Sequence, residues 1–203
     1  MDKYKEYYPH GIMFHRFHQE KKYGGSISPH NLENIINMVD IKRILTPAEW
    51  IEKCINNSLD DEDICLTFDD CLKSQYEIAL PILQKYKLKA FFFVHSITFD
   101  NDYDYNELFF TLIDNHYESF DIFFDQYLKY TNINRDIFIS NNFVDFKDKL
   151  ISNHNHYSEN EIRYRFIRNT YYKTDQFIDS LKSFFSNKIK QLDKKIWMNS
   201  NEI

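Results

Sequence analysis

The sequence predicts an α/β fold in which the first hundred residues alternate between strands and helices. Short apolar runs, such as "ICLTF" and "AFFFV", are separated by segments whose apolar residues recur at helical spacing. The strand candidates are apolar almost throughout, which is typical of a parallel sheet buried on both faces. Helix starts are marked by a capping residue followed by proline. A barrel and an open doubly wound sheet both fit this pattern.

The first predicted elements are a strand, a helix, a second strand and a second helix. "GIMFHRF" is the first strand candidate, and Ser28 and Pro29 have the character of an N-cap and a first helical residue. Residues 41–45, "IKRIL", form the second strand candidate. Thr46 and Glu49 then have the spacing of a capping box, which predicts the start of the second helix.

The next predicted elements are the strand "ICLTF", a helix over residues 72–86 and the strand "AFFFV". Pro81 lies inside this helix and is expected to kink it, because proline lacks a backbone donor. The spacing of the apolar residues predicts that one face of the helix carries Leu72, Tyr76, Ala79 and Leu83.

The pattern of predicted elements changes after the first hundred residues. Residues 1–100 are predicted to form an α/β domain, and residues 101–195 an aromatic-rich helical insertion or subdomain. Residues 196–203 begin a further element, because Asn199 and Glu202 have the spacing of an N-cap and its capping partner. The helix that they would start is not completed in this sequence, which suggests a truncated chain.

Composition restricts the classes of partner. The formal net charge is −6, the isoelectric point is about 5.7 and the mean hydropathy is −0.59. These values argue against a nucleic-acid partner, which attracts basic surfaces. We expect no membrane span and no signal peptide, and therefore a cytoplasmic protein. The three cysteines form no CxxC pair, so neither a disulfide framework nor a cysteine zinc site is indicated.

Two adjacent carboxylates, Asp69 and Asp70, follow the strand candidate "ICLTF". Functional residues of parallel α/β folds lie at the carboxyl ends of strands. One carboxylate could hold a cation while its neighbour accepts a proton from water, and the cation would relieve the repulsion between the two charges. The alternative is that the pair merely caps the following helix.

The stretch "LTFDDCLKSQYEIALPILQKYKLKAFFFV" resembles the first signature block of the NodB-like polysaccharide deacetylases. That block has threonine, phenylalanine, two aspartates and glycine, then a helix with an internal proline and an "ATFFV"-like strand. "IMFHRFH" looks like the first strand of the family, and "ILTPAEW" is similar to its second strand. The resemblance covers roughly residues 8–98.

This resemblance implies a partial (β/α) barrel of the polysaccharide deacetylase type with an α-helical, aromatic-rich insertion. It implies a hydrolase that uses a divalent metal ion, zinc or similar, to remove acetyl groups from an N-acetylated glycan or sugar precursor. By position, Asp69 matches the family's general base and Asp70 its metal-binding aspartate. The water attacking the acetamide carbonyl would give its proton to Asp69.

The chain departs from the family pattern in several places. Cys71 stands where the family has the glycine after its aspartates, which puts the backbone turn in doubt. The sequence has no HxxxH pair to supply the family's two histidine ligands, and the blocks with its general-acid histidine and substrate-binding arginine are missing. All of these blocks would follow Ile203, which fits truncation better than divergence.

Other histidines are candidates for the pocket. His15 and His18 end the first strand candidate, and His95 follows the fourth, so all three are tentative pocket residues that could touch metal or substrate. A hydrogen bond to a neighbouring loop is the more common role for such a histidine. His154 and His156 form an HxH motif, for which a solvated loop is favoured over a metal site.

Two rival functions remain open at this stage. The first is a non-catalytic module that uses the same scaffold to bind a glycan or a partner. The second is an unrelated hydrolase with two aspartates, such as a phosphatase. Release of acetate from N-acetylhexosamine oligomers would separate the deacetylase from both.

Overall fold

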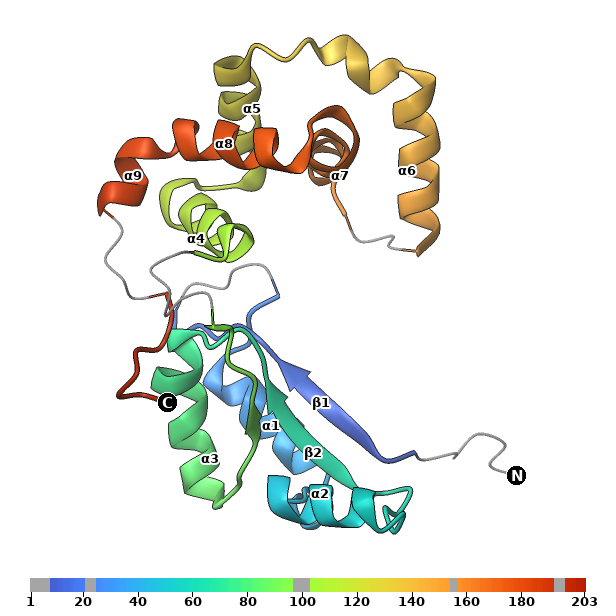
Figure 1. Ribbon diagram of the computed structural model, residues 1–203, viewed down its shortest axis with the longest axis vertical. Helices are drawn as coiled ribbons and strands as arrows, with labels where there is room; N and C mark the ends of the chain where they lie inside the picture. The colour runs from blue at the N-terminus through green and yellow to red at the C-terminus, as the bar shows by residue number, and fades with distance from the viewer. Residues whose placement is uncertain (1–7, 21–24, 97–102, 154–156, 192–195) are drawn as a thin grey trace. The chain divides into compact units, whose positions relative to one another are not determined.

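The computed structural model describes residues 8–20, 25–96, 103–153, 157–191 and 196–203. The chain divides into two compact units (Figure 1). The first, here called the sheet unit, comprises Met1–Asp102 and Asp193–Ile203. The second, the helical unit, comprises Tyr103–Leu192 and is inserted between the two segments of the first.

Three parallel strands form the sheet found in the described part of the sheet unit (Figure 1). β2 (Ile64–Phe68) lies between β1 (His10–Phe14) and β3 (Phe91–Phe92). β1 and β2 are paired in register along their whole length, and Phe14 lies opposite Phe68 at the carboxyl end. The α/β class predicted from the sequence is confirmed, while the partial barrel remains a prediction.

The first two helices of the sheet unit begin where their caps predict. α1 (Pro29–Met38) starts after Ser28, whose hydroxyl accepts a hydrogen bond from the first turn. α2 (Pro47–Ile55) starts after Thr46, and both hydrogen bonds of the capping box with Glu49 are present. Each cap satisfies backbone donors that the first helical turn leaves open.

The strand predicted for residues 41–45 is wrong. Ile41–Arg43 form a 3-10 helix, η1, instead. Asp40 adopts a φ of 61°, and its carboxylate accepts a hydrogen bond from the backbone two residues on, which closes a turn. Ile44 then forms an isolated parallel bridge to Ile64. The apolar run therefore touches the sheet without forming a strand in it.

The helix after β2 is less regular than predicted. A π-helix, η2 (Gln75–Ala79), precedes α3 (Leu80–Tyr86), so Pro81 lies in the first turn of α3, where proline is tolerated. The wider π turn shifts the buried face. Tyr76, predicted on that face, is 37% exposed, whereas the polar side chain of Gln75 is fully buried. Leu72, Ala79 and Leu83 are buried as predicted.

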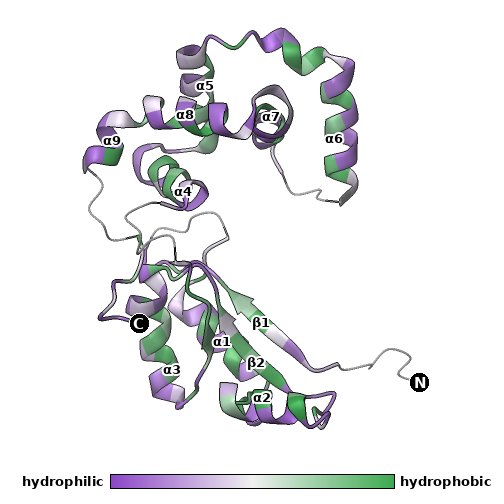
Figure 2. Ribbon diagram, viewed as in Figure 1, coloured by the Kyte–Doolittle hydropathy of each residue, from purple (hydrophilic) through white to green (hydrophobic). Residues whose placement is uncertain are grey.

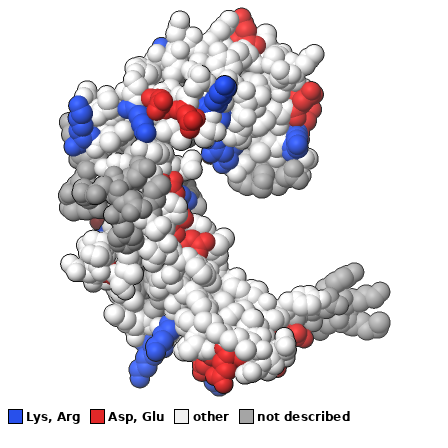
Figure 3. Space-filling model, in the orientation of Figure 1, with Lys and Arg blue, Asp and Glu red and all other residues white. Residues whose placement is uncertain are grey.

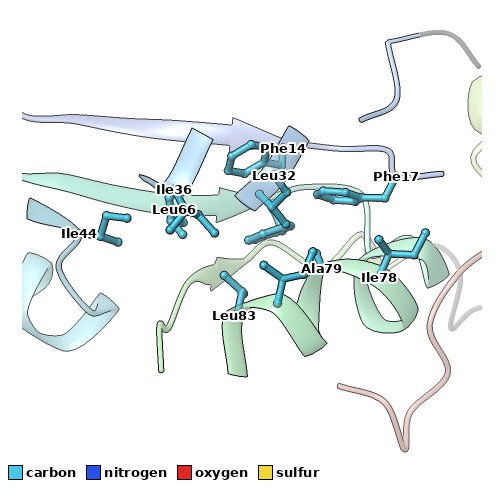
Figure 4. Packing of buried hydrophobic residues seen from close by; sticks show 11 residues of the cluster. Phe14, Phe17, Leu32, Ile36, Ile44, Leu66, Ile78, Ala79 and Leu83 are labelled. Atoms are coloured by element: carbon cyan, nitrogen blue, oxygen red, sulfur yellow. The ribbon is translucent and has the colours of Figure 1, made fainter. Parts of the chain in front are cut away.

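Helices cover one face of the sheet, and the hydrophobic core lies between them (Figure 4). Phe14 and Phe17 pack near Phe68, with ring centroids 5.4 and 5.9 Å from its ring. The predicted burial of both faces is incomplete, because Met13 is 59% exposed and Phe93 is 55% exposed. The core cluster consists of Phe14, Phe17, Leu32, Ile36, Ile44, Leu66, Phe68, Ile78, Ala79, Ile82 and Leu83.

The helical unit has an aromatic core. Phe123, Phe124, Tyr127 and Phe185 are fully buried in it. Figure 2 shows apolar and polar residues alternating along α6, as in an amphipathic helix. None of the described helices is long and apolar enough to cross a membrane. The helices are α4 (Tyr105–His116), α5 (Phe120–Thr131), α6 (Asn141–Asn153), α7 (Glu159–Phe166), α8 (Thr174–Phe184) and α9 (Ser186–Gln191).

Candidate functional site

Two carboxylates and an imidazole meet at the carboxyl ends of β1 and β2. His15 follows the last residue of β1, and Asp69 and Asp70 follow the last residue of β2. Since Phe14 lies opposite Phe68, the parallel register brings the next residues of both strands side by side. The Nε2 atom of His15 lies 3.8 Å from Asp69 Oδ2 and 3.9 Å from Asp70 Oδ2.

These three side chains are open to solvent to a similar degree. The exposed fraction is 35% for His15, 28% for Asp69 and 32% for Asp70. A ligand could therefore reach all three without unfolding of the strands. Their partial exposure also moderates the repulsion between the carboxylates, because water screens exposed charges.

The backbone that carries the carboxylates has an uncommon conformation. Asp70 has a φ of 72° and Cys71 a φ of 55°, so two successive residues with side chains are left-handed. Such a conformation is disfavoured for residues other than glycine. The turn after the aspartates is thus the one that favours glycine, and Cys71 occupies it with a buried thiol. Burial raises the pKa of this thiol, which keeps it neutral.

The segment at residues 196–203 forms hydrogen bonds with the backbone of this turn and of the residues that follow it. The backbone of Met198 donates to Cys71 O at 2.9 Å, and that of Lys73 donates to Ile196 O at 2.8 Å. The side chains of Lys73 and Glu202 form an ion pair. Consequently, the chain at the carboxyl end of the left-handed pair is held by residues far away in the sequence.

A buried amide also holds the site, and sequence reasoning missed it. Gln75 is fully buried, and its Nε2 atom donates to His15 O at 2.9 Å and to Asp69 O at 2.5 Å. One signal could have found it: Gln75 is a polar residue in line with the apolar positions Ile78 and Ala79. Polar residues at such positions are hydrogen-bonded or functional.

The other predicted histidines have different surroundings. Nδ1 of His18 lies 2.8 Å from the hydroxyl of Ser26, so this ring binds a neighbouring loop. His95 is exposed after β3. His154 and His156 lie outside the described residues. Of the tentative pocket residues, the structure places His15 beside the carboxylates.

A cavity of about 240 Å³ opens beside His15. It is lined by Met13, Phe14, His15, Arg16, Gly25 and Ile27. An apolar wall with one imidazole and one guanidinium group suits a ligand with both apolar and polar parts. The cavity lies within the sheet unit.

The three side chains are of types that bind zinc, but their spacing is not that of a formed metal site. Imidazole and carboxylate are common zinc ligands, and two ligands on one tetrahedral zinc ion lie roughly 3.4 Å apart. The separations of 3.8 and 3.9 Å are longer than this, so the side chains would have to close slightly around an ion. Among the described residues, no group of three or more His, Cys, Asp or Glu side chains is arranged to hold a metal ion.

A parallel sheet with carboxylates and an imidazole at its strand ends is typical of α/β enzymes. The sequence model of the polysaccharide deacetylase family matches residues 56–109, which include both carboxylates. This match confirms the predicted resemblance, and it shows residues 56–109 to be deacetylase-like.

Two solved structures are among those similar to the chain. One is a de-N-acetylase from Aggregatibacter actinomycetemcomitans, with 22% identity and a TM-score of 0.35 over 41% of this chain and 36% of that chain. The other is the Streptococcus pyogenes deacetylase PplD in complex with acetate, with 22% identity and a TM-score of 0.39 over 49% of each chain. This chain thus spans less than half the length of either protein. No curated protein matched the chain significantly.

Proposed function

We propose that the chain carries the carboxylate site of a metal-dependent deacetylase that acts on N-acetylated sugars in a glycan or a glycan precursor. The observation that carries this proposal is the convergence of Asp69, Asp70 and His15 at the ends of two paired strands. Both carboxylates lie in the segment that matches the deacetylase family. A simple helix cap would not require an imidazole within 4 Å of both carboxylates.

The proposed roles are those that the family resemblance implies for the two aspartates, with His15 added as a cation ligand. Asp70 and His15 would hold the cation, and Asp69 would stay free to accept a proton from the attacking water. When bound, a zinc-like cation polarises the acetamide carbonyl and acidifies water. Asp69 would later return the proton to the leaving amine of the sugar unless another acid does so.

This assignment requires a further ligand. Catalytic zinc sites usually use three protein ligands, and Asp70 with His15 supplies two of them if Asp69 is kept for the proton. We assign the remaining ligand to no described residue.

The proposed substrate class is an uncharged N-acetylated sugar in a glycan or a glycan precursor. An anionic polymer is a poor candidate, because the chain has a formal net charge of −6. Figure 3 shows acidic and basic side chains interspersed on the viewed face of each unit. An uncharged sugar chain would meet no net repulsion from such a surface.

The experiment combines metal binding with product analysis. Co²⁺ is titrated into the full chain while the visible absorption is recorded, and acetate is measured after incubation with N-acetylglucosamine oligomers. We expect Co²⁺ binding that Asp70→Asn weakens at least about tenfold, and acetate release that the same variant abolishes. Asp61→Asn is the matched control, because Asp61 is an exposed loop residue before β2.

Each result has a definite reading. Absence of both Co²⁺ binding and acetate release in the wild-type chain would contradict the proposal. Binding of the same oligomers that survives Asp70→Asn, without acetate release, would favour a non-catalytic glycan-binding module. Turnover of phosphate esters without acetate release would identify a different hydrolase.

A further inference from the structure

Gln75 lies at the base of the site without taking part in its proposed chemistry. It is the first residue of η2 and is fully buried, although its amide is strongly polar. Burial of an amide is unfavourable unless its hydrogen-bonding groups are satisfied. The position therefore needs an explanation other than packing.

The amide links the two strand ends that carry the site. Its Nε2 atom donates to the carbonyl of His15 at 2.9 Å and to that of Asp69 at 2.5 Å. Both acceptors are carbonyls, so the nitrogen of the amide must face them. His15 and Asp69 are the first residues beyond β1 and β2.

The hydrogen bonds between β1 and β2 do not connect the main chains of His15 and Asp69 in this way. Asp69 N donates to Phe14 O at 3.1 Å, which is the last ladder bond between the two strands. The His15 carbonyl would otherwise lack a donor from β2. In effect, Gln75 extends the pairing of the strands by one residue, to the residues whose side chains lie 3.8 Å apart.

The other end of the amide is left unsatisfied. Gln75 Oε1 is buried and has no hydrogen-bond partner among the described residues. A buried polar atom without a partner lowers stability, and an apolar side chain of the same length would avoid that penalty. A residue selected for stability alone would not need this oxygen, whereas the two donors of the nitrogen require an amide.

From this geometry we propose that Gln75 is the positioning residue of the site. It fixes the main chain of His15 against that of Asp69, so that the imidazole stays within 4 Å of the carboxylates. The catalytic meaning of this role rests on the proposed deacetylase function, whereas the positioning itself can be measured without it. Groups that orient metal ligands in this way commonly change metal affinity about 10–100-fold when replaced.

The first measurement is independent of metal and activity. It records how far the NMR chemical shift of the His15 ring changes when Asp69→Asn removes a charge 3.8 Å away, at the same fixed pH in all variants. This change is compared in the wild-type background and in Gln75→Met, which has a similar length but no donors. We expect the change in chemical shift caused by Asp69→Asn to be smaller by about twofold or more in Gln75→Met. The reason is that the amide no longer couples His15 and Asp69.

Two further variants control this comparison. Gln84→Met changes an exposed glutamine of α3 and should leave the shift unchanged. Gln75→Asn keeps the donors but is one methylene shorter, and it replaces Gln75→Met if that variant does not fold. An undiminished shift in the folded Gln75 variant would overturn the positioning role.

The second measurement tests the link to function. We expect Gln75→Met to weaken Co²⁺ binding about tenfold at unchanged far-UV circular dichroism, and Gln84→Met to leave it unchanged. Wild-type affinity in the folded Gln75→Met would overturn the role in metal binding. If the wild-type chain binds no Co²⁺ and releases no acetate, the proposed function fails, and the NMR comparison alone decides whether Gln75 positions His15.

Discussion

The two units of the chain differ in their buried polar groups and in their strained backbone. The sheet unit holds a buried amide with an unpartnered oxygen and two successive left-handed residues, Asp70 and Cys71. In the helical unit, the buried Tyr127 hydroxyl is bonded to Ser180, and burial raises the pKa of Tyr127, which keeps the hydroxyl neutral. Arg163 Nε lacks a partner there, but the same guanidinium donates to Asn160.

This difference supports the proposed site in the sheet unit. Strain and unsatisfied groups reduce stability, and they gather at sites where geometry matters more than stability. In the sheet unit, Gln75 and the left-handed pair Asp70 and Cys71 lie at the two carboxylates, whereas the left-handed Asp40 closes a turn elsewhere. In the helical unit the aromatic rings pack edge to face at centroid distances such as 5.5 Å for Tyr117 and Phe123, which favours stability. Substitutions in the two units should therefore have separable effects.

The largest expected effect is on turnover. Asp69→Asn removes the proposed proton acceptor, and we expect acetate release to fall about 10²–10⁴-fold. Co²⁺ affinity should change little, because Asp70 and His15 remain. Thermal unfolding should also be unchanged or slightly improved, since one of two neighbouring negative charges is lost. Acetate release equal to that of the wild type would remove Asp69 from the mechanism.

The next effect is on stability. Phe123 is fully buried in the helical unit and contacts the rings of Tyr117, Tyr164 and Phe185, among others. Phe123→Ala should lower the free energy of unfolding by about 3–5 kcal/mol. Urea unfolding followed by fluorescence measures this loss, with the exposed Ile139→Ala as control. A loss below about 1 kcal/mol would show that the aromatic core is not tightly packed.

A smaller effect concerns a paired acid at the other end of the sheet. Lys53 Nζ lies 2.8 Å from Asp63 Oδ2, and the side chains are 32% and 10% exposed. Burial alone would raise the pKa of Asp63, but hydrogen bonds from Lys53 and the backbone of Asp60 lower it below its ordinary value of 3.8. The folded state thus binds this proton less readily than the unfolded chain. The resulting stability is present above pH 3.8 and is lost as the pH falls through the folded pKa.

Asp63→Asn tests this dependence. We expect it to lower stability by about 1–2 kcal/mol near neutral pH, with the partial exposure of Lys53 limiting the loss. The difference from the wild type should shrink as the pH falls through the folded pKa of Asp63, because the wild-type carboxyl is then protonated as well. Urea midpoints measured from neutral to acidic pH give this difference. A constant difference across that range would show that the ion pair is not its source.

The smallest effect tests the left-handed turn. At Cys71, with a φ of 55°, the glycine variant should be more stable than the alanine variant by about 1 kcal/mol, because glycine accepts this conformation without strain. At Cys54, which is exposed in α2, the order should reverse by a similar amount. Thermal unfolding of the four variants gives both differences. The same order at both positions would mean that the turn is not strained.

Local signals predicted much of the sheet unit. The caps at Ser28 and Thr46 and the strand "ICLTF" depend on neighbouring residues, and the structure confirms them. The strand predicted for residues 41–45 failed because the turn at Asp40 outweighs the apolar run that follows. In the helical unit, α6 lies within residues 101–195, which were predicted to be helical, although its sequence, "NNFVDFKDKLISN", is rich in residues with low helix propensity.

The candidate site was partly predictable. The position of Asp69 and Asp70 at a strand end follows from the sequence pattern, and their roles remain predictions. His15 could be placed only at the mouth of the fold, because its distance from the carboxylates depends on the pairing of β1 with β2. Gln75 was missed because its spacing from Ile78 and Ala79 indicates a buried position but not its partners, which depend on the pairing of β1 with β2.

The insertion of Tyr103–Leu192 between two segments of the sheet unit bears on how the helical unit could be gained or lost. Trp197 forms a β-bridge with Leu72, so the chain after the helical unit packs again in the sheet unit. Connections between packed bodies tolerate cutting and joining better than their interiors do. Gain, loss or exchange of the entire helical portion could then occur without severing a single strand of the sheet.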